Sequence, residues 1–145
     1  MTELIQEDKL ITINVVNSKL PLIEFSVIRL LQLQEMIEKT QEKLSFLGLD
    51  ASEASHVLQS LRETDTVAID LLSDVIILQK AKKEEMIFLS STEADIDLVL
   101  YGKLSWKSCL VGQNVLLSWQ LGDGCTIDFY RKPGQIFENR IKIKV

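Results

Sequence analysis

The sequence predicts an α+β fold, in which a long N-terminal antiparallel helical hairpin precedes a small antiparallel β-sheet that packs on the open end of the hairpin. Three observations predict this fold. Mostly apolar seams at steps of three and four run over residues 23–47 and 57–78, a turn sequence separates them near residue 50, and the period changes to that of strands after residue 85. We expect a single domain over residues 1–145, with the helical hairpin over residues 12–85 and a β-rich subdomain over residues 86–145.

The first helix is expected to begin after Thr12, whose hydroxyl can accept a hydrogen bond from a backbone N–H of the first turn. Pro21 removes one helical hydrogen bond and crowds the preceding turn, so we expect a kink or a break near this residue. Beyond it, a mostly apolar seam at steps of three and four comprises Ile23, Ser26, Leu30, Leu33, Ile37, Thr40, Leu44 and Leu47.

The segment GLDASEA separates the two predicted helices. Gly48 suits a left-handed helix end, and Asp50 and Glu53 have the spacing of a capping box. The seam of the second helix comprises Val57, Leu61, Thr64, Ala68, Leu71, Val75 and Leu78. Partners across an antiparallel hairpin have position numbers with a constant sum, and pairing the seams in this way brings Thr40 opposite Thr64. We therefore predict an antiparallel hairpin with its tip at GLDASEA.

Away from this tip, both helices are apolar on more than one face, as in LIEFSVIRLLQL and VAIDLLSDVIIL. Helices of this kind need a second covering layer. The half nearer the tip has few apolar residues outside its seam. We therefore expect the β-rich part to cover the open end of the hairpin and the tip to project.

The β-rich part contains five segments that we interpret as strands: MIFLSS, DIDLVLYG, NVLLSWQ, CTIDFY and RIKIKV. Between the third and the fourth lies LGDG, whose glycines, Gly122 and Gly124, suit the positive φ angles of a tight hairpin turn. In the last segment, Ile141, Ile143 and Val145 alternate with basic residues. These patterns predict four or five short antiparallel strands.

Composition limits the classes of function. The net charge is −5, with the negative charge in the first 85 residues and a slight positive excess in the rest. The basic residues near the C-terminus lack interleaved aromatic residues, so nucleic acid is disfavoured as a partner and a solvated edge strand is favoured. The chain has no long apolar stretch and its N-terminus is acidic and polar, so we expect a cytoplasmic protein with no membrane partner. Cys109 and Cys125 show no metal-ligand spacing, and we expect both to be reduced.

Two segments resemble a known family. In ITINVVNSKLPLI, Thr12 precedes a helix that carries Asn17 and then Leu20 and Pro21. The matching residues nearer the C-terminus are Gly112, Trp119, Leu121, Gly122, Phe129, Phe137 and Arg140. This pattern resembles the bacterial "domain of unknown function 2203" family, of which the chain would be a divergent member. The resemblance spans most of the chain, and it implies a helix–helix–sheet organisation but no established activity.

The chain departs from the family's pattern near its C-terminus. Arg131 stands where the family usually has histidine, Tyr130 where it has tryptophan, and Ser118 where it often has cysteine. FENR replaces Phe-x-Gly-Arg. If the family histidine serves as a ligand or a base, this chain has lost it.

Few residues of this sequence suggest catalysis. His56, the only histidine, lies near the predicted tip, without the partners that a metal site or a catalytic triad needs. The sequence has no phosphate-binding loop and no nucleophile elbow. Glu93, Asp95 and Asp97 lack the spacing and the glycine of a calcium loop, so we interpret them as solvated carboxylates. We predict no catalytic residue, no metal site and no cofactor, and whether the protein is an enzyme stays open.

The aromatic residues of the β-rich part allow two interpretations. Trp119, Phe129 and Tyr130 are first expected to cover the helices as part of the core. In the alternative, Trp119 and Tyr130 line a ligand cleft at the rim of the sheet, where Arg131 and Arg140 donate hydrogen bonds to a carboxylate or a phosphate.

Three functions from different classes are therefore considered. The first is a non-enzymatic binding or adaptor protein that forms a homodimer or binds a protein partner through its helical hairpin. The second is a transcription-related factor, because the topology is similar to that of Gre-type transcript-cleavage factors, and here the tip would present Asp50 and Glu53 to RNA polymerase. The third is binding, or transformation, of a small molecule or anion at the face of the sheet.

Overall fold

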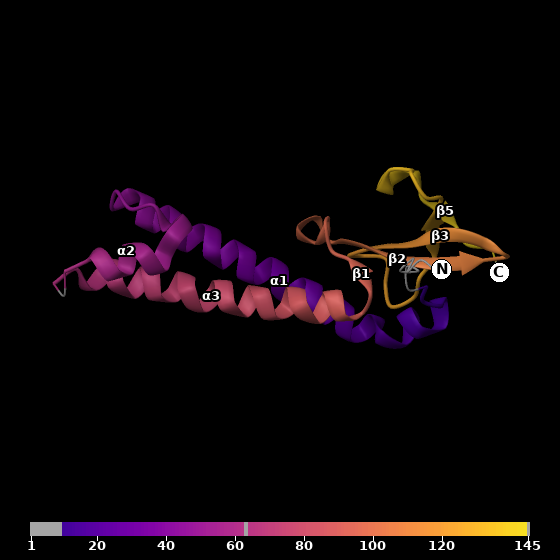
Figure 1. The fold of residues 1–145 in the computed structure, drawn as a ribbon, viewed down its shortest axis with the longest axis horizontal. Helices are drawn as coiled ribbons and strands as arrows, with labels where there is room; N and C mark the ends of the chain where they lie inside the picture. The colour runs from indigo at the N-terminus through magenta and orange to yellow at the C-terminus, as the bar shows by residue number, and fades with distance from the viewer. Residues whose placement is uncertain (1–9, 63, 145) are drawn as a thin grey trace, which may run out of the picture. The chain divides into compact units, whose positions relative to one another are not determined.

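The structure is a computed structural model that describes residues 10–62 and 64–144. It confirms the α+β class: long helices precede a five-stranded antiparallel sheet (Figure 1). The first helix, α1, spans Ile13–Phe46, and the last helix, α3, spans Thr66–Ser91. No helix within the described residues is long and apolar enough to cross a membrane.

The chain divides into two compact units. The sheet unit comprises residues 1–28 and 87–145, and the hairpin unit comprises residues 29–86. Helices α1 and α3 each contribute residues to both units. The single domain expected over residues 1–145 stays a prediction.

The beginning of α1 agrees with the predicted cap. The N–H of Val15 donates a hydrogen bond to the Thr12 hydroxyl oxygen at 3.3 Å, and the N–H of Val16 donates to the Thr12 carbonyl at 3.1 Å. The helix then continues through Pro21 without a break. Leu20 and Ile23, which flank the proline, are fully buried, so packing of the surrounding turns compensates for the lost hydrogen bond.

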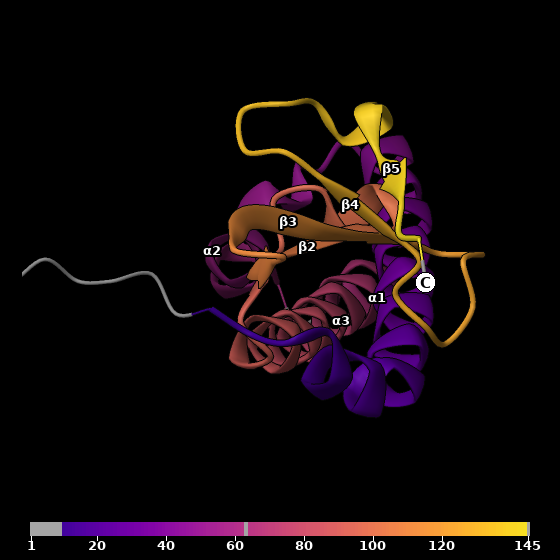
Figure 2. The same cartoon turned by 90° about the vertical axis from the view of Figure 1, so that its right-hand side faces the viewer.

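The sheet is a simple meander in which each strand pairs with the next one along the chain. Its strands are β1 (Ala94–Asp95), β2 (Lys103–Leu110), β3 (Gln113–Gln120), β4 (Phe129–Arg131) and β5 (Ile141–Lys142). The two long strands, β2 and β3, are joined by Val111 and Gly112, whose φ angles of 49° and 75° are those of a two-residue hairpin turn. Figure 2 shows the strands beside the N-terminal part of α1.

One face of the sheet is apolar and carries the core of this unit. Directly paired residues of β2 and β3 point to the same face, and the pairs Leu104 with Trp119 and Trp106 with Leu117 are almost completely buried. From α1, the unit buries a stripe at helical spacing, Val16, Leu20, Ile23 and Val27. The sheet thus covers the open end of the helices, as the sequence predicts.

The first strand expected from the sequence is wrong. MIFLSS, residues 86–91, belongs to α3, so the helical part extends past residue 85 and the strands begin only at Ala94. Leu89 is fully buried, and the Thr92 hydroxyl donates a hydrogen bond to its carbonyl just beyond the helix end. Burial of Leu89 on the core side of the helix outweighs the local preference of these residues for a strand.

Other strand boundaries also differ from those expected. DIDLVLYG forms only the end of β1, because the Asp95 carboxylate accepts the N–H of Asp97 and turns the chain into a 3-10 helix at Val99–Tyr101. Strand β2 was not expected at all. LGDG is part of an eight-residue connection between β3 and β4, residues 121–128, and not of a tight turn. CTIDFY and RIKIKV contribute only β4 and β5, although the N–H of Ile143 still donates to the Asp128 carbonyl; Val145 lies outside the described residues.

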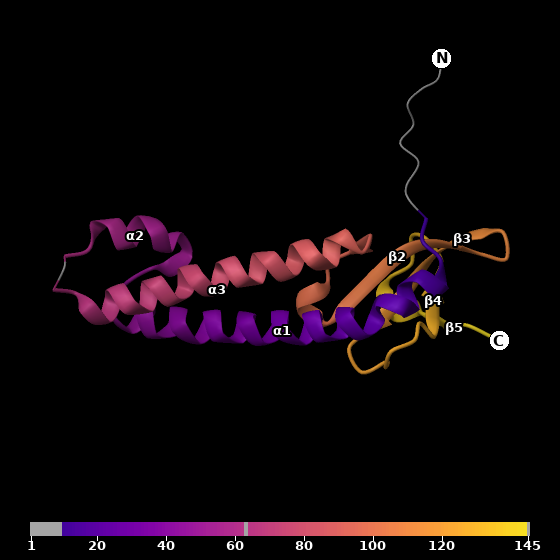
Figure 3. The same ribbon diagram turned by 90° about the horizontal axis from the view of Figure 1, so that it is seen from below.

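The described part of the hairpin unit contains the three α-helices α1, α2 and α3 (Figure 3). After α1, a 3-10 turn (Ala51–Glu53) leads into the short helix α2 (Ala54–Ser60), and α3 then runs antiparallel to α1. Within the hairpin unit, one cluster of buried residues comprises Leu44, Ala51, Ala54, Leu72 and Val75. The 3-10 turn and α2 therefore each supply one alanine, Ala51 and Ala54, to a core that α1 and α3 share.

The predicted register of the hairpin is wrong, because the second helix is not continuous. Thr64 lies in a turn between α2 and α3, so it cannot belong to a helical seam opposite Thr40. The Asp65 carboxylate accepts the N–H of Arg62 at 3.1 Å, and the Asp65 carbonyl accepts the N–H of Ile69 at 2.9 Å. The side-chain bond closes the turn between α2 and α3, and the bond to the Asp65 carbonyl begins α3. The Thr40 hydroxyl donates to the Met36 carbonyl within α1.

Candidate functional site

The four residues of the predicted ligand cleft do not share one face of the sheet. Tyr130 pairs with Leu117, which puts it on the same face as Trp119, whereas Arg131 pairs with Leu116 on the opposite face. Trp119 is fully buried, and its indole N–H donates to the carbonyl of Gly124 at 2.9 Å. Trp119 therefore belongs to the core, as the first interpretation expected.

On the opposite face, three cationic side chains surround one buried phenylalanine. Phe137 is 3% exposed, and the charged groups of Lys103, Arg131 and Arg140 lie 5.3, 5.5 and 5.1 Å from its ring centre. Arg140 also lies 4.2 Å above the ring of Phe129. Cations over aromatic faces are attracted to the ring electrons. The cluster therefore holds the segment after β4 against the sheet.

The donors of these cations are largely used within the chain. Arg140 pairs with Asp123 at 2.6 Å, with side chains 13% and 11% exposed, and Arg131 donates to the Ser105 hydroxyl and the Gln135 carbonyl, both at 3.1 Å. The Nε atom of Arg131 is buried without a hydrogen-bond partner among the described residues. An anion would have to displace these internal partners to bind Arg131 or Arg140.

Lys103 completes the cluster with a more exposed ion pair. Its ammonium donates to a Glu138 carboxylate oxygen at 2.8 Å, and the two side chains are 25% and 62% exposed. This hydrogen bond lowers the pKa of Glu138 from its ordinary value of 4.5. The pair fixes the short 3-10 helix Phe137–Asn139 on the sheet.

The acidic residues of the predicted tip have local roles. The Asp50 carboxylate accepts the N–H of Ser52 at 2.9 Å at the start of the 3-10 turn, and this bond lowers the pKa of Asp50. Glu53 precedes α2 and makes no side-chain cap there. His56 is exposed on α2, and Cys109 and Cys125 are free and exposed. No group of three metal-ligating side chains gathers among residues 10–62 and 64–144.

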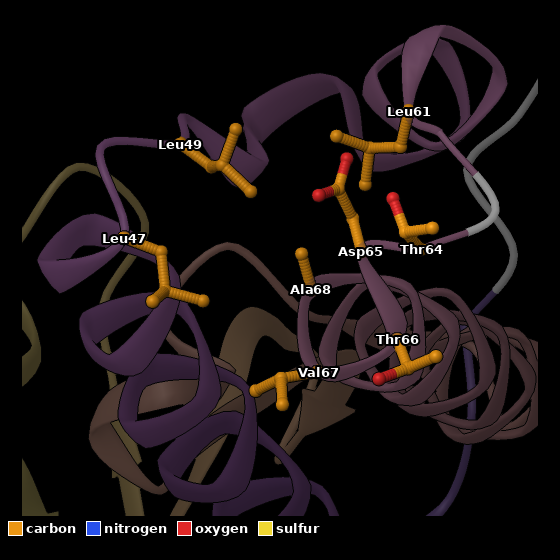
Figure 4. Close-up of a pocket in the computed structure, with 8 residues that line it drawn as sticks. All are labelled: Leu47, Leu49, Leu61, Thr64, Asp65, Thr66, Val67 and Ala68. Atoms are coloured by element: carbon orange, nitrogen blue, oxygen red, sulfur yellow. The ribbon is translucent and has the colours of Figure 1, made fainter.

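A hollow of about 390 Å³ lies at the tip end of the hairpin unit (Figure 4). It is lined by Leu47, Leu49, Leu61, Thr64, Asp65, Thr66, Val67 and Ala68. Asp65 is the one ionisable group in this lining, and its carboxylate accepts the Arg62 N–H in the turn before α3. The hollow therefore lacks a paired acid and base.

Sequence reasoning missed a two-stripe surface on the hairpin unit. Positions i, i+3, i+7 and i+10 of a helix lie on one side, and both α1 and α3 show the order apolar, charged, charged, apolar at this spacing. All eight side chains are exposed: Met36, Lys39, Lys43 and Phe46 on α1, and Val67, Asp70, Asp74 and Ile77 on α3. The apolar members are between 50% and 84% exposed. This spacing is visible in the sequence and could have been found there.

Both stripes lie on the same side of the hairpin unit. On α1, Lys43 directly precedes the buried Leu44, and on α3, Asp74 directly precedes the buried Val75. The exposed stripe of each helix is therefore rotated about the helix axis by the same angle from the buried side of that helix. In two antiparallel helices, equal rotations in the same sense point to the same side of the pair. We call the eight residues together the outer face of the hairpin unit.

Neither protein-family models, nor curated proteins, nor solved structures match this chain. The resemblance to the "domain of unknown function 2203" family thus stays a prediction. Several of the residues that carry it have structural roles: Thr12 caps α1, Trp119 is core, and Phe129, Phe137 and Arg140 stack together.

Asn17, another residue of this pattern, also has a structural role. Its side-chain oxygen accepts the N–H of Ile127 at 2.7 Å, so it ties the eight-residue loop between β3 and β4 to α1. The pattern therefore describes how the sheet unit is held together more than it describes a reaction site.

Proposed function

We propose that this protein is a non-enzymatic binding module that associates with a second copy of itself through the outer face of its hairpin unit. The observation that carries the proposal is the exposure of four large apolar side chains on one side of two helices. Phe46 is 84% exposed, and Val67 and Ile77 are 65% and 66% exposed. Clustered exposed apolar groups among polar ones are typical of protein–protein contacts.

A four-helix arrangement suits this surface. Two hairpins that stack face to face bury the apolar members of both outer faces and form a bundle. Homodimers with twofold symmetry are the commonest assemblies of soluble proteins. The outer face offers four apolar and four charged side chains, so we expect a reversible dimer in the micromolar range.

The two alternative functions have less support. A tip that binds RNA polymerase would use Asp50 and Glu53, but the Asp50 carboxylate already caps the adjacent turn. An anion site on the sheet would use Arg131 and Arg140, which both donate to groups of the same chain. The hairpin surface, in contrast, has apolar groups without cover.

Light scattering of the purified protein across the micromolar range tests the proposal. We expect a dimer for the wild type and a monomer for the variant Phe46→Ser/Ile77→Ser, because serine removes most of the apolar area. The matched control is Leu22→Ser/Phe25→Ser, which removes side chains of similar exposure, 65% and 67%, from α1 in the sheet unit. The control should remain dimeric.

Two results would contradict the proposal. The first is a wild-type protein that stays monomeric throughout this range. The second is a dimer that the control substitutions disrupt while the hairpin substitutions leave it intact, since this result would move the interface to the sheet unit.

A further inference from the structure

The two stripes of the outer face are complementary in charge as well as alike in spacing. The stripe on α1 carries two lysines between its apolar ends, and the stripe on α3 carries two aspartates. When the stripes are aligned antiparallel, the position numbers of every facing pair add up to the same value. The facing pairs are Met36 with Ile77, Lys39 with Asp74, Lys43 with Asp70, and Phe46 with Val67.

These charges are largely free to meet a partner. Lys43, Asp70 and Asp74 form no ion pair with any residue that the structure describes, although they are exposed. Lys39 pairs with Glu35 of the same helix at 3.0 Å, with side chains 69% and 64% exposed. An exposed pair within one helix stabilises little, so Lys39 can change partner at small cost.

The register of α1 against α3 places both stripes at the same level of the hairpin unit. Arg29 lies 3.9 Å from Glu85, and Leu44 shares a buried cluster with Leu72. The position numbers of these pairs have nearly the same sums as the facing pairs of the stripes. Rotation about a twofold axis parallel to the helices does not change the height of a residue along the hairpin. Such an axis would therefore bring the α1 stripe of one copy opposite the α3 stripe of the other.

We propose that the partner of the outer face is a second copy of this chain, related by a twofold axis along the hairpin, with α1 of each copy packed antiparallel against α3 of the other. Lys39 and Lys43 then meet the aspartates of the partner's α3, and the symmetry forms each contact twice. The apolar ends of the stripes close the contact on both sides of the charges. This pairing rests on the proposed function, since it specifies the arrangement of the dimer.

The charges disfavour the other face-to-face arrangement. A twofold axis across the hairpin would stack α1 on the α1 of the partner, with lysines facing lysines, and α3 on the α3 of the partner, with aspartates facing aspartates. Like charges in direct contact destabilise an interface. The sequence of the outer face therefore selects one of two arrangements.

Charge-reversal variants test the pairing by sedimentation velocity. In the acidic variant, Lys39→Glu/Lys43→Glu, both stripes are negative; in the basic variant, Asp70→Lys/Asp74→Lys, both are positive. Each variant alone should raise the dimer Kd at least about 100-fold, because symmetry reverses four charge contacts at once. An equimolar mixture of the two should form a heterodimer with a Kd near that of the wild type.

Matched controls separate the pairing from net charge and from folding. Lys80→Glu/Lys83→Glu changes the charge of exposed α3 residues outside the stripe by the same amount as the acidic variant and should keep the wild-type Kd. A chain with all four reversals regains complementary stripes and should dimerise again, which also shows that the substituted helices still fold. Far-UV circular dichroism of every variant checks the helix content.

The outcomes distinguish this pairing from the proposed function. A wild-type protein that stays monomeric contradicts both. A wild-type dimer whose Kd is unchanged in either double variant overturns the pairing alone. The pairing is also overturned if the mixture and the four-substitution chain both remain monomeric.

Discussion

The ion pair between Arg140 and Asp123 should be the most important single polar contact of the sheet unit. Its nitrogen–oxygen distance is 2.6 Å, and both side chains are nearly buried. The same Asp123 oxygen accepts the N–H of Gln120 at 3.0 Å. Asp123→Ala would leave a nearly buried guanidinium without its carboxylate, and removing one partner of a buried pair costs about 3–5 kcal/mol.

The structure places the expected loss at the lower end of this range. Arg140 keeps its contacts with the rings of Phe129 and Phe137, at 4.2 and 5.1 Å, so the charge is not left without any attractive partner. We expect a loss of about 3 kcal/mol in the free energy of unfolding. For a chain of this size this loss lowers the melting temperature by about 10 °C.

Urea unfolding followed by tryptophan fluorescence measures this change. Both tryptophans, Trp106 and Trp119, are buried in the sheet unit, so their emission reports on the unit that contains the substitution. The matched control is Glu138→Ala, which breaks the Lys103 pair on the same face, where Glu138 is 62% exposed and solvent screens the charges. A loss below about 1 kcal/mol for Asp123→Ala, or equal losses for the two variants, would refute the reasoning.

Three smaller changes test other contacts. Asn17→Ala removes the acceptor of the Ile127 N–H, and we expect a loss of about 1–3 kcal/mol in urea unfolding together with faster hydrogen exchange at that amide; an unchanged exchange rate would contradict the assigned bond. Val111→Asn relieves a β-branched residue at a φ of 49° in a fully exposed turn and should stabilise the protein by about 1 kcal/mol, whereas any destabilisation would argue against strain there. Lys103→Met should raise the lowered pKa of Glu138 toward 4.5 in an NMR titration, because the hydrogen bond from Lys103 is the main cause of the shift. In the wild type, this pair contributes to stability above the ordinary pKa of Glu138, and the contribution is lost as the pH falls through the lowered pKa.

The parts of the fold that depend on local chemistry could be predicted from the sequence. The cap at Thr12 and the left-handed Gly48 after α1, with a φ of 77°, follow from what these residues do in any protein. The break before α3 was missed because the apolar seam continues across it in the sequence, whereas the Asp65 carboxylate accepts the Arg62 N–H in a turn at this point. Strand β2 was also missed, although Lys103, Leu104, Ser105 and Trp106 alternate between polar and apolar residues as in a strand.

The candidate sites depended on contacts between residues far apart in the chain, which a periodic pattern does not reveal. Arg131 reaches Ser105, and Arg140 reaches Asp123, so the donors proposed for a ligand serve the fold. Strand pairing could not be predicted from the sequence pattern, and it places Trp119 and Arg131 on opposite faces of the sheet. The two stripes of the outer face depend only on spacing within each helix. They were missed because the prediction used only the apolar seam on the buried side of each helix.

Sedimentation equilibrium of the wild-type protein tests most directly whether the hairpin carries a self-association surface. Three starting concentrations across the micromolar range should fit one reversible equilibrium, with a weight-average mass that rises from 16.5 kDa toward twice this value. The Phe46→Ser/Ile77→Ser variant should stay near 16.5 kDa under the same conditions. A wild-type mass that remains at 16.5 kDa at every concentration would contradict the account.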